Sequence, residues 1–188
     1  MTADEFLLWC LDQEERYELV DGAPVLKFDN GPEMMAGASA RHDQVVVNLI
    51  AALRSRLRGG PCHAKTADQA ARMARGNVRR PDVTIDCGPR RPESFESVAP
   101  AVFFEVLSPS TRRIDLLRNT NEYQQIASLK HFVMLEPGRV EALVFSRAPD
   151  GEWLAGEAVK GLDGALKLPG VGLSLPMAEV YEDVELES

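Results

Sequence analysis

The segment Ala101-Val-Phe-Phe-Glu-Val-Leu107 constrains the fold most, because it is the most apolar candidate strand of the chain and yet carries a carboxylate in its interior. A short continuous run of this composition predicts a strand that is buried on both faces. Burying the Glu105 carboxylate costs several kcal/mol unless the group is paired, protonated or bound to a metal. The chain must therefore build a covered sheet that also provides a counterpart for Glu105.

Local signals predict the elements around this strand. Thr2 and Glu5 form a capping box for a first helix, and Asp21-Gly22 joins two alternating runs into a hairpin. Apolar residues at helical spacing predict a long helix at 40–57, ended by Gly59-Gly60-Pro61. Further strands are expected at 62–75, 83–87, 131–135, 140–145, 153–159 and 165–168, and a further helix at 113–127. This order predicts one α/β or α+β domain over residues 1–188, with an N-terminal hairpin, C-terminal antiparallel strands and an acidic tail from about residue 180.

Cysteine usage and the absence of targeting signals indicate a compartment. Cys10, Cys62 and Cys87 are odd in number and widely spaced, which favours free thiols over a disulfide framework or a structural zinc site. Asp4 and Glu5 stand where a signal peptide would carry Lys or Arg. No apolar run reaches the ~18 residues that a membrane span needs. We therefore expect a cytoplasmic protein that does not enter the membrane.

The charge is unevenly distributed along the chain. The formal net charge is −8, which argues against a general polyanion binder. Residues 41–91 nevertheless hold eleven Lys or Arg and only four Asp or Glu, a local net charge of +7. Such a segment indicates either a phosphate-bearing partner or an ordinary solvated surface. We expect its arginines to form a positive rim near the functional site: Arg54, Arg56, Arg58, Arg72, Arg75, Arg79 and Arg80.

Two carboxylates are the main candidates for chemistry. Asp82 enters a predicted strand after Arg79-Arg80-Pro81, and Glu105 lies in the apolar strand. If these strands are neighbours, the two carboxylates meet at one end of the sheet, and hard oxygen donors of this kind hold Mg²⁺. The alternative is a buried ion pair between Glu105 and an arginine such as Arg79 or Arg112. Glu18 is a candidate third acid, and His42, at the start of the long helix, is either a site residue or a cap.

Several segments together resemble a known family. They are Tyr17-Glu-Leu-Val-Asp-Gly22, His42, Arg80-Pro-Asp-Val83, Phe104-Glu-Val-Leu-Ser-Pro-Ser-Thr111, Asp115, Tyr123, Leu135-Glu-Pro137 and Leu168-Pro-Gly170. The sequence resembles the Uma-type restriction endonucleases, a domain of unknown function within the PD-(D/E)XK nuclease superfamily, over nearly its whole length. The resemblance implies a restriction-endonuclease-like core, a mixed sheet flanked by helices. It also implies Asp82 and Glu105 as ligands of Mg²⁺ or Mn²⁺, Glu18 as an auxiliary acid and His42 nearby.

The implied reaction is metal-dependent hydrolysis of nucleic-acid phosphodiester bonds, with DNA as the expected substrate. One position departs from the pattern: the superfamily's lysine, two residues after the strand glutamate, is Leu107 here. In the family this lysine moves to the next helix, where the matching residue is Asn119, on one face with Asp115 and Tyr123. An amide cannot supply the positive charge of an ammonium, so Lys65 and Lys130 are candidate substitutes.

Three functions remain open from the sequence. The first is a metal-dependent endonuclease, impaired by Asn119. The second is an inactive protein of the same fold that binds nucleic acid or a protein partner, and the third is an assembly module without a nucleic-acid role. The retained acids favour the first function and Asn119 favours the second. Family analogy and the C-terminal strands are compatible with a homodimer.

Overall fold

The computed structural model describes residues 1–27, 39–107 and 120–187. The expectations for Asp115, Asn119 and Arg112 lie outside these residues, as does the segment Ser108-Pro-Ser-Thr111 of the resemblance. The described part of the expected helix at 113–127 is helical at 120–124.

A six-stranded mixed sheet forms the centre of the molecule, with the strand order β10-β9-β8-β7-β6-β3. Neighbouring strands are antiparallel except β7 and β8, which are parallel. The predicted mixed sheet flanked by helices is therefore confirmed. The strands are β3 His63–Thr66, β6 Val83–Asp86, β7 Pro100–Val106, β8 His131–Glu136, β9 Glu141–Ser146 and β10 Glu157–Lys160.

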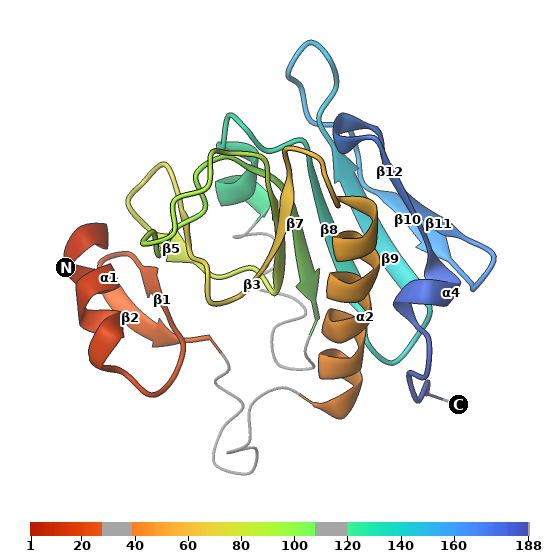
Figure 1. Cartoon of the computed structure of the whole chain (residues 1–188), viewed down its shortest axis with the longest axis horizontal. Helices are drawn as coiled ribbons and strands as arrows, with labels where there is room; N and C mark the ends of the chain where they lie inside the picture. Colours follow the sequence, from red (N-terminus) through yellow and green to blue (C-terminus); the bar gives the residue numbers. More distant parts are fainter. Residues whose placement is uncertain (28–38, 108–119, 188) are drawn as a thin grey trace.

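Helix α2 (Ala40–Arg56) covers one face of this sheet (Figure 1). Ser39 caps it by accepting a hydrogen bond from the His42 amide. Its apolar stripe of Val45, Leu49 and Leu53 is fully buried in the same core cluster as β6 and β7. The hairpin of β11 (Ala165–Leu168) and β12 (Leu173–Pro176) and the short helix α4 (Met177–Val180) extend this layer. The apolar spacing at 40–57 thus predicted both the helix and its buried face.

The opposite face of the sheet has its own core. Phe103 of β7 and Phe132 of β8 pack there with Tyr123 and Leu129. Strand β7 therefore buries side chains on both faces, as its apolar composition predicts.

The N-terminal residues form a smaller unit against the edge of the main sheet (Figure 1). Thr2 and Glu5 make the predicted capping box of α1 (Ala3–Trp9), which a 3₁₀ turn at Cys10–Asp12 extends. Strands β1 (Tyr17–Val20) and β2 (Ala23–Leu26) form the predicted hairpin. Its turn residues Asp21 and Gly22 have φ of 49° and 81°, the left-handed values that favour Asp-Gly in such turns.

Two short strands, β4 (Ala71–Arg72) and β5 (Val78–Arg79), complete a second sheet in the order β2-β1-β5-β4. Leu19 of β1 pairs with Val78 of β5. This pairing attaches the hairpin to the chain just before Asp82, so the hairpin lies beside the end of β6.

A disulfide joins Cys62 to Cys87, and the expectation of free thiols is wrong for these two residues. They flank β3 and β6, whose register places His63 opposite Asp86. One step further along the ladder brings the two cysteines face to face, with their Cα atoms 4.0 Å apart. Cys10 is a free thiol.

The C-terminal segment begins in the core. Val180 and Tyr181 are buried, and the Tyr181 hydroxyl donates to the carbonyls of Glu136 and Glu141. The segment expected as an acidic tail thus has a docked beginning. No helix in the described part of the chain is long and apolar enough to cross a membrane.

Candidate active site

Asp82 and Glu105 lie at the same end of the central sheet. Strands β6 and β7 are antiparallel neighbours, with Val83 opposite Phe104. Asp82, one residue before Val83, therefore stands level with Glu105, and its Oδ2 accepts a hydrogen bond from the Val106 amide at 2.8 Å. The predicted adjacency of the two strands is confirmed.

The Asp82 carboxylate is buried, with 4% of the residue exposed, and is surrounded by donors. Besides the Val106 amide, the ring of His42 lies 3.2 Å from Oδ2, and the Lys27 ammonium lies 2.9 Å from Oδ1. Burial alone would raise the pKa of Asp82, but the Lys27 charge and the bonds from His42 and Val106 hold it well below its usual range. Asp82 is therefore ionised at neutral pH.

The pKa of Glu105 is shifted in the opposite direction from that of Asp82. Burial, reinforced by the charges of Asp82 and Glu18, raises the pKa of Glu105 to about 8, although the Lys27 ammonium and a hydrogen bond from Tyr123 act against this rise. The Tyr123 hydroxyl donates to Glu105 Oε1. At neutral pH Glu105 is therefore mostly protonated in the absence of a further cation.

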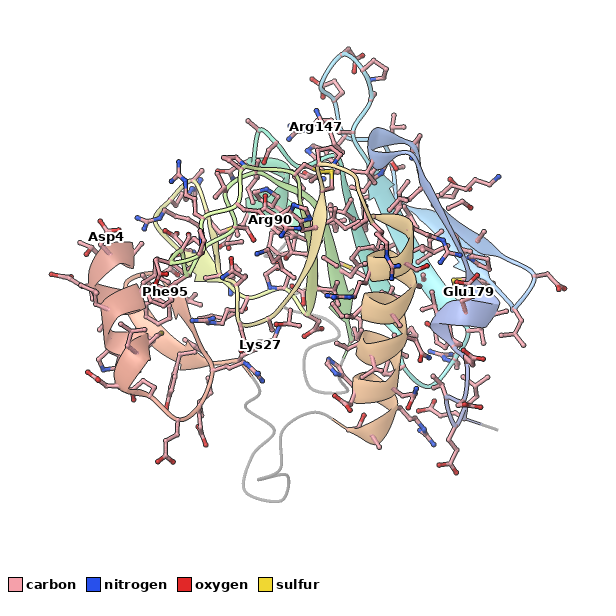
Figure 2. All side chains as sticks on the ribbon, in the orientation of Figure 1. Asp4, Lys27, Arg90, Phe95, Arg147 and Glu179 are labelled. Atoms are coloured by element: carbon pink, nitrogen blue, oxygen red, sulfur yellow. A yellow bond between two sulfur atoms is a disulfide. The ribbon has the colours of Figure 1, made fainter. Side chains whose placement is uncertain are left out.

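Lys27 is a site residue that sequence reasoning missed. Its side chain is 6% exposed. The ammonium donates to the Arg80 carbonyl, pairs with Asp82 and lies 3.9 Å from Glu105 Oε2. Figure 2 shows Lys27 between the N-terminal unit and the main sheet. The neighbouring carboxylates outweigh the effect of burial and raise the pKa of Lys27 above its ordinary value, so it is a permanent cation.

Lys27 reaches this position through the hairpin. Its backbone amide donates to the Arg16 carbonyl and so extends the β1–β2 pairing by one step. Only one local sign of this role is present in the sequence, which is that Lys27 lies within the apolar-alternating run Val25-Leu-Lys-Phe28. Nothing local places that lysine against β6 and β7.

Glu18 stands beside this group with both carboxylate oxygens engaged. It accepts from the Arg79 guanidinium at 3.0 Å and from the Arg80 amide at 2.8 Å. Arg79 also pairs with Glu122 at 2.8 Å. The alternative ion pair of Glu105 with Arg79 is thus not formed, because Arg79 serves Glu18 and Glu122.

The positive rim expected near the carboxylates is wrong for three of its arginines. Arg79 is buried between two glutamates, and the Arg80 guanidinium is buried against the carbonyls of Tyr17, Ala67 and Asp68. Arg72 pairs with Asp4 and Glu96. Arg79 and Arg80 use their charges inside the fold, whereas Arg72 uses its charge in ion pairs at the surface.

The candidate substitute lysines lie elsewhere. Lys130 precedes β8, which runs parallel to β7 with His131 opposite Val102. It is therefore at the far end of the strands, about 13 Å along the sheet from Glu105 at ~3.3 Å per residue. Lys65 of β3 pairs with Thr84 of β6 and lines a separate hollow. Lys27 contacts the carboxylates directly, so it occupies the position for which the sequence offered Asn119, Lys65 or Lys130.

The oxygens around Lys27 fit a divalent cation. Asp82 Oδ1, Glu105 Oε2 and the Arg80 carbonyl all face the Lys27 ammonium, and such hard donors suit Mg²⁺, which takes one or two carboxylates and completes its shell with water and phosphate oxygens. No group of three or more His, Cys, Asp or Glu side chains in the described ranges is arranged to hold a metal ion. A cation here would therefore rest on two carboxylates.

Comparison with solved structures identifies the class of fold. A crystal structure from Anabaena variabilis, described as "a putative nuclease belonging to DUF820", superposes with a TM-score of 0.70 at 17% identity. The match covers 96% of this chain and 97% of the other. The chain thus has the fold of that protein.

Sequence comparison gives the family. The family model Uma2, described as "Putative restriction endonuclease", matches residues 3–178. An uncharacterised protein of Synechocystis is 27% identical over 183 residues, which cover 96% of this chain and 91% of the relative. The chain belongs to the Uma2 family, as its resemblance implied.

Proposed function

We propose that the protein is a metal-dependent endonuclease that hydrolyses phosphodiester bonds of DNA. The observation that carries this proposal is the convergence of Asp82, Glu105 and Lys27 at one end of the sheet. Two acids and a lysine on a restriction-endonuclease-like fold are the groups that phosphodiester hydrolysis requires.

Each residue has a distinct role in this proposal. Asp82 and Glu105 would hold Mg²⁺ or Mn²⁺, which when bound supplies Lewis acidity toward the phosphate. The Lys27 ammonium binds a nonbridging phosphate oxygen and stabilises the charge that develops there. His42 orients Asp82, Tyr123 orients Glu105, and Glu18 fixes the Arg79-Arg80 segment.

The charges of the group support this assignment. Without a metal, Lys27 compensates Asp82, and Glu105 is neutral because it holds a proton. With a divalent cation, an ionised Glu105 and one phosphodiester, the formal charges again cancel. The group is therefore balanced both in its resting state and when loaded with substrate, which a buried site requires.

A second candidate function is an inactive nucleic-acid-binding protein of this fold. The ion pair between Lys27 and Asp82 favours it, since the ammonium already takes the position that a cation would share. In that case divalent ions would leave the protein unaffected.

The experiment follows thermal unfolding and plasmid cleavage with Mg²⁺, Mn²⁺ or neither. A ligand that binds only the folded state raises the unfolding midpoint. We expect both ions to raise the midpoint, and cleavage to disappear in Asp82→Asn. The matched control is Asp163→Asn, an exposed acid outside the site. An unchanged midpoint together with absent cleavage would reject the metal-dependent endonuclease, and oligonucleotide binding by the same protein would then establish the second candidate.

A further inference from the structure

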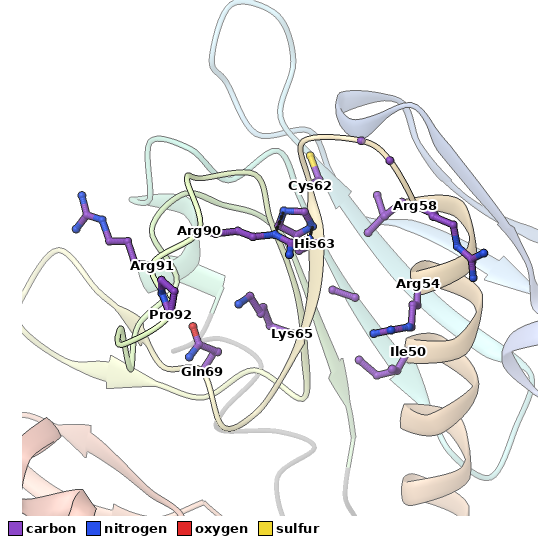
Figure 3. Close-up of a pocket in the computed structure, with 14 residues that line it drawn as sticks. Ile50, Arg54, Arg58, Cys62, His63, Lys65, Gln69, Arg90, Arg91 and Pro92 are labelled. Carbon is purple, nitrogen blue, oxygen red and sulfur yellow. Dashed lines mark hydrogen bonds between the residues drawn. The ribbon is translucent and has the colours of Figure 1, made fainter.

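A second group of cations surrounds a hollow of about 790 Å³ beside the edge strand β3 (Figure 3). Arg54 of α2 and Arg58, which lies just beyond the C-terminal end of α2, line it from one side. Lys65 of β3 and Arg90 and Arg91 of the loop after β6 line it from the other side. The hollow is therefore bounded by five cations from three separate elements.

These cations have no carboxylate counterions among the described residues. The lining of the hollow includes no Asp or Glu, and none of the five cations is within ion-pair distance of an acid in residues 1–27, 39–107 and 120–187. Arg56, the last residue of α2, lies between Arg54 and Arg58 in the sequence and instead pairs with Glu179 at 2.7 Å. In a protein of net charge −8, a hollow lined this way concentrates the local positive potential.

The acids nearest the hollow are already engaged. Asp86 and Glu96 line a small adjoining pocket. Asp86 accepts hydrogen bonds from the amides of Gly88, Val98 and Ala99, and Glu96 pairs with Arg72. Both are therefore structural groups. Arg90 contacts the His63 ring, with its Nε donating to His63 Nε2 at 2.9 Å, but no carboxylate of the hollow's lining neutralises the five cations.

The hollow and the carboxylate group lie along the same pair of strands. Lys65 is opposite Thr84, and Thr66 is opposite Val83, the residue after Asp82. Two residues of strand, about 7 Å, separate the level of Lys65 from that of Asp82. A polymer whose charges repeat along its length can occupy both places, whereas a single small anion cannot.

We propose that this hollow binds the phosphate backbone of a nucleic-acid strand that continues to the carboxylate group. The inference rests on the proposed function for its choice of polyanion. Guanidinium forks bind phosphate oxygens in pairs, and the hollow supplies four of them. It acts as a sequence-independent clamp that sets where the strand enters the site.

The test measures binding of a labelled oligonucleotide, single-stranded and duplex, in EDTA at several salt concentrations. The variant Arg54→Gln/Arg58→Gln is compared with Arg56→Gln, which removes the same type of charge from the same stretch of chain but from an existing ion pair. We expect the double variant to bind at least tenfold more weakly at low salt. Its slope of log K against log salt should fall by roughly 1.4 to 1.8, because each lost phosphate contact contributes about 0.7 to 0.9. Arg56→Gln should remain within threefold of the parent.

A second variant, Lys65→Gln/Arg91→Gln, removes two cations from the opposite side of the hollow. We expect the same loss of affinity and the same fall in the salt slope, so the test does not depend on whether the protein tolerates the substitutions at Arg54 and Arg58. The inference is overturned if the parent does not bind the oligonucleotide or if both double variants bind like the parent. It is also overturned if pyrophosphate or polyglutamate competes as well as nucleic acid at equal charge. Because binding is measured without metal, absent cleavage with intact, arginine-dependent binding would reject the proposed function alone.

Discussion

The Lys27 ammonium lies 2.9 Å from the Asp82 carboxylate, with both side chains almost fully buried. The two residues come from different sheets, and the pairing of β1 with β5 brings them together. A buried ion pair contributes little net stability but is costly to break from one side. The same ammonium also faces Glu105, so this contact links the chemistry of both acids to one lysine.

Replacing Lys27 by Met tests its proposed catalytic role. Removing one preorganised charge from a phosphoryl site typically lowers the rate by about 10²–10³, and we expect a loss of this size in cleavage. The metal-induced rise in the unfolding midpoint should persist or grow, because the ammonium no longer competes for the carboxylate oxygens. Lys130→Met is the matched control and should cleave like the parent. Equal cleavage by Lys27→Met and the parent would remove Lys27 from the mechanism.

Metal affinity should rise with pH because Glu105 must lose its proton to bind a cation. Its pKa is raised to about 8 from an ordinary 4.5, so affinity should increase as pH rises toward about 8 and level off above it. The stability of the metal-free protein should change with pH in the opposite direction. Protonated Glu105 stabilises the fold fully below pH about 4.5, and this contribution to the free energy of unfolding is lost as the pH rises through about 8.

Calorimetric titration with Mn²⁺ in two buffers of different ionisation enthalpy measures the proton released on binding. Glu105→Gln should abolish this release. Equal proton release from Glu105→Gln and the parent would assign the titration to another group.

Tyr123→Phe should move this pH dependence upward. The Tyr123 hydroxyl donates to Glu105 and lowers its pKa, so its removal should raise the pKa of Glu105 further. The midpoint of the metal-affinity profile then shifts to higher pH. Tyr181→Phe removes another buried hydroxyl, which bonds two carbonyls and belongs to the core cluster on the opposite face of the sheet from Tyr123, and should leave the midpoint in place. A shift of the same size in both variants would indicate a general effect on the fold.

Asn119→Lys remains a prediction from the sequence, since residue 119 lies outside the described ranges. The sequence predicted weak or absent cleavage by the parent and a gain on this substitution. Tyr123, one helical turn later, donates to Glu105, which supports the expectation that this helix face points toward the carboxylates. In the Lys27→Met background we expect Asn119→Lys to restore at least tenfold of the lost cleavage. Gln124→Lys, which lies on another face, should restore none, and its success would refute the assigned face.

The Cys62–Cys87 disulfide should stabilise the protein measurably. It closes a loop with a sequence separation of 25 residues, and loops of this size contribute about 3.5 kcal/mol in the chain-entropy model. Denaturant unfolding with and without reductant should show a loss of this order. Cys10→Ser in the oxidised protein should show almost none, because Cys10 is a free thiol. If reductant leaves the denaturation midpoint unchanged, the disulfide contributes nothing in solution.

Local signals predicted most of the elements, although not β5, β12 or α4, and they did not predict the contacts between elements. The Thr2–Glu5 capping box and the Asp21-Gly22 turn depend on neighbouring residues, so the sequence alone was sufficient for both. The sequence also predicted that Asp82 and Glu105 meet at one end of the sheet, provided that their strands are neighbours. Lys27 could not be found in this way, because its position depends on how the hairpin docks.

The same reason explains the errors in charge and in cysteine pairing. Arg79 and Arg72 add to the basic composition of residues 41–91. In the fold, however, acids from distant segments pair with them: Glu122 with Arg79 and Asp4 with Arg72. Cys62 and Cys87 are apart in sequence and meet through the register of β3 with β6. Composition counts charges and thiols, whereas packing decides which of them remain available.

The position of Lys27 between Asp82 and Glu105 has a consequence for how the protein folds in the absence of metal. Carboxylate centres that depend on metal for neutralisation repel one another when the metal is scarce, and their folding then follows metal supply. Here the chain carries its own counterion, Lys27, to Asp82, and Glu105 stores a proton. A newly synthesised molecule can therefore complete its fold in metal-poor surroundings, before it binds the ion that the proposed function requires.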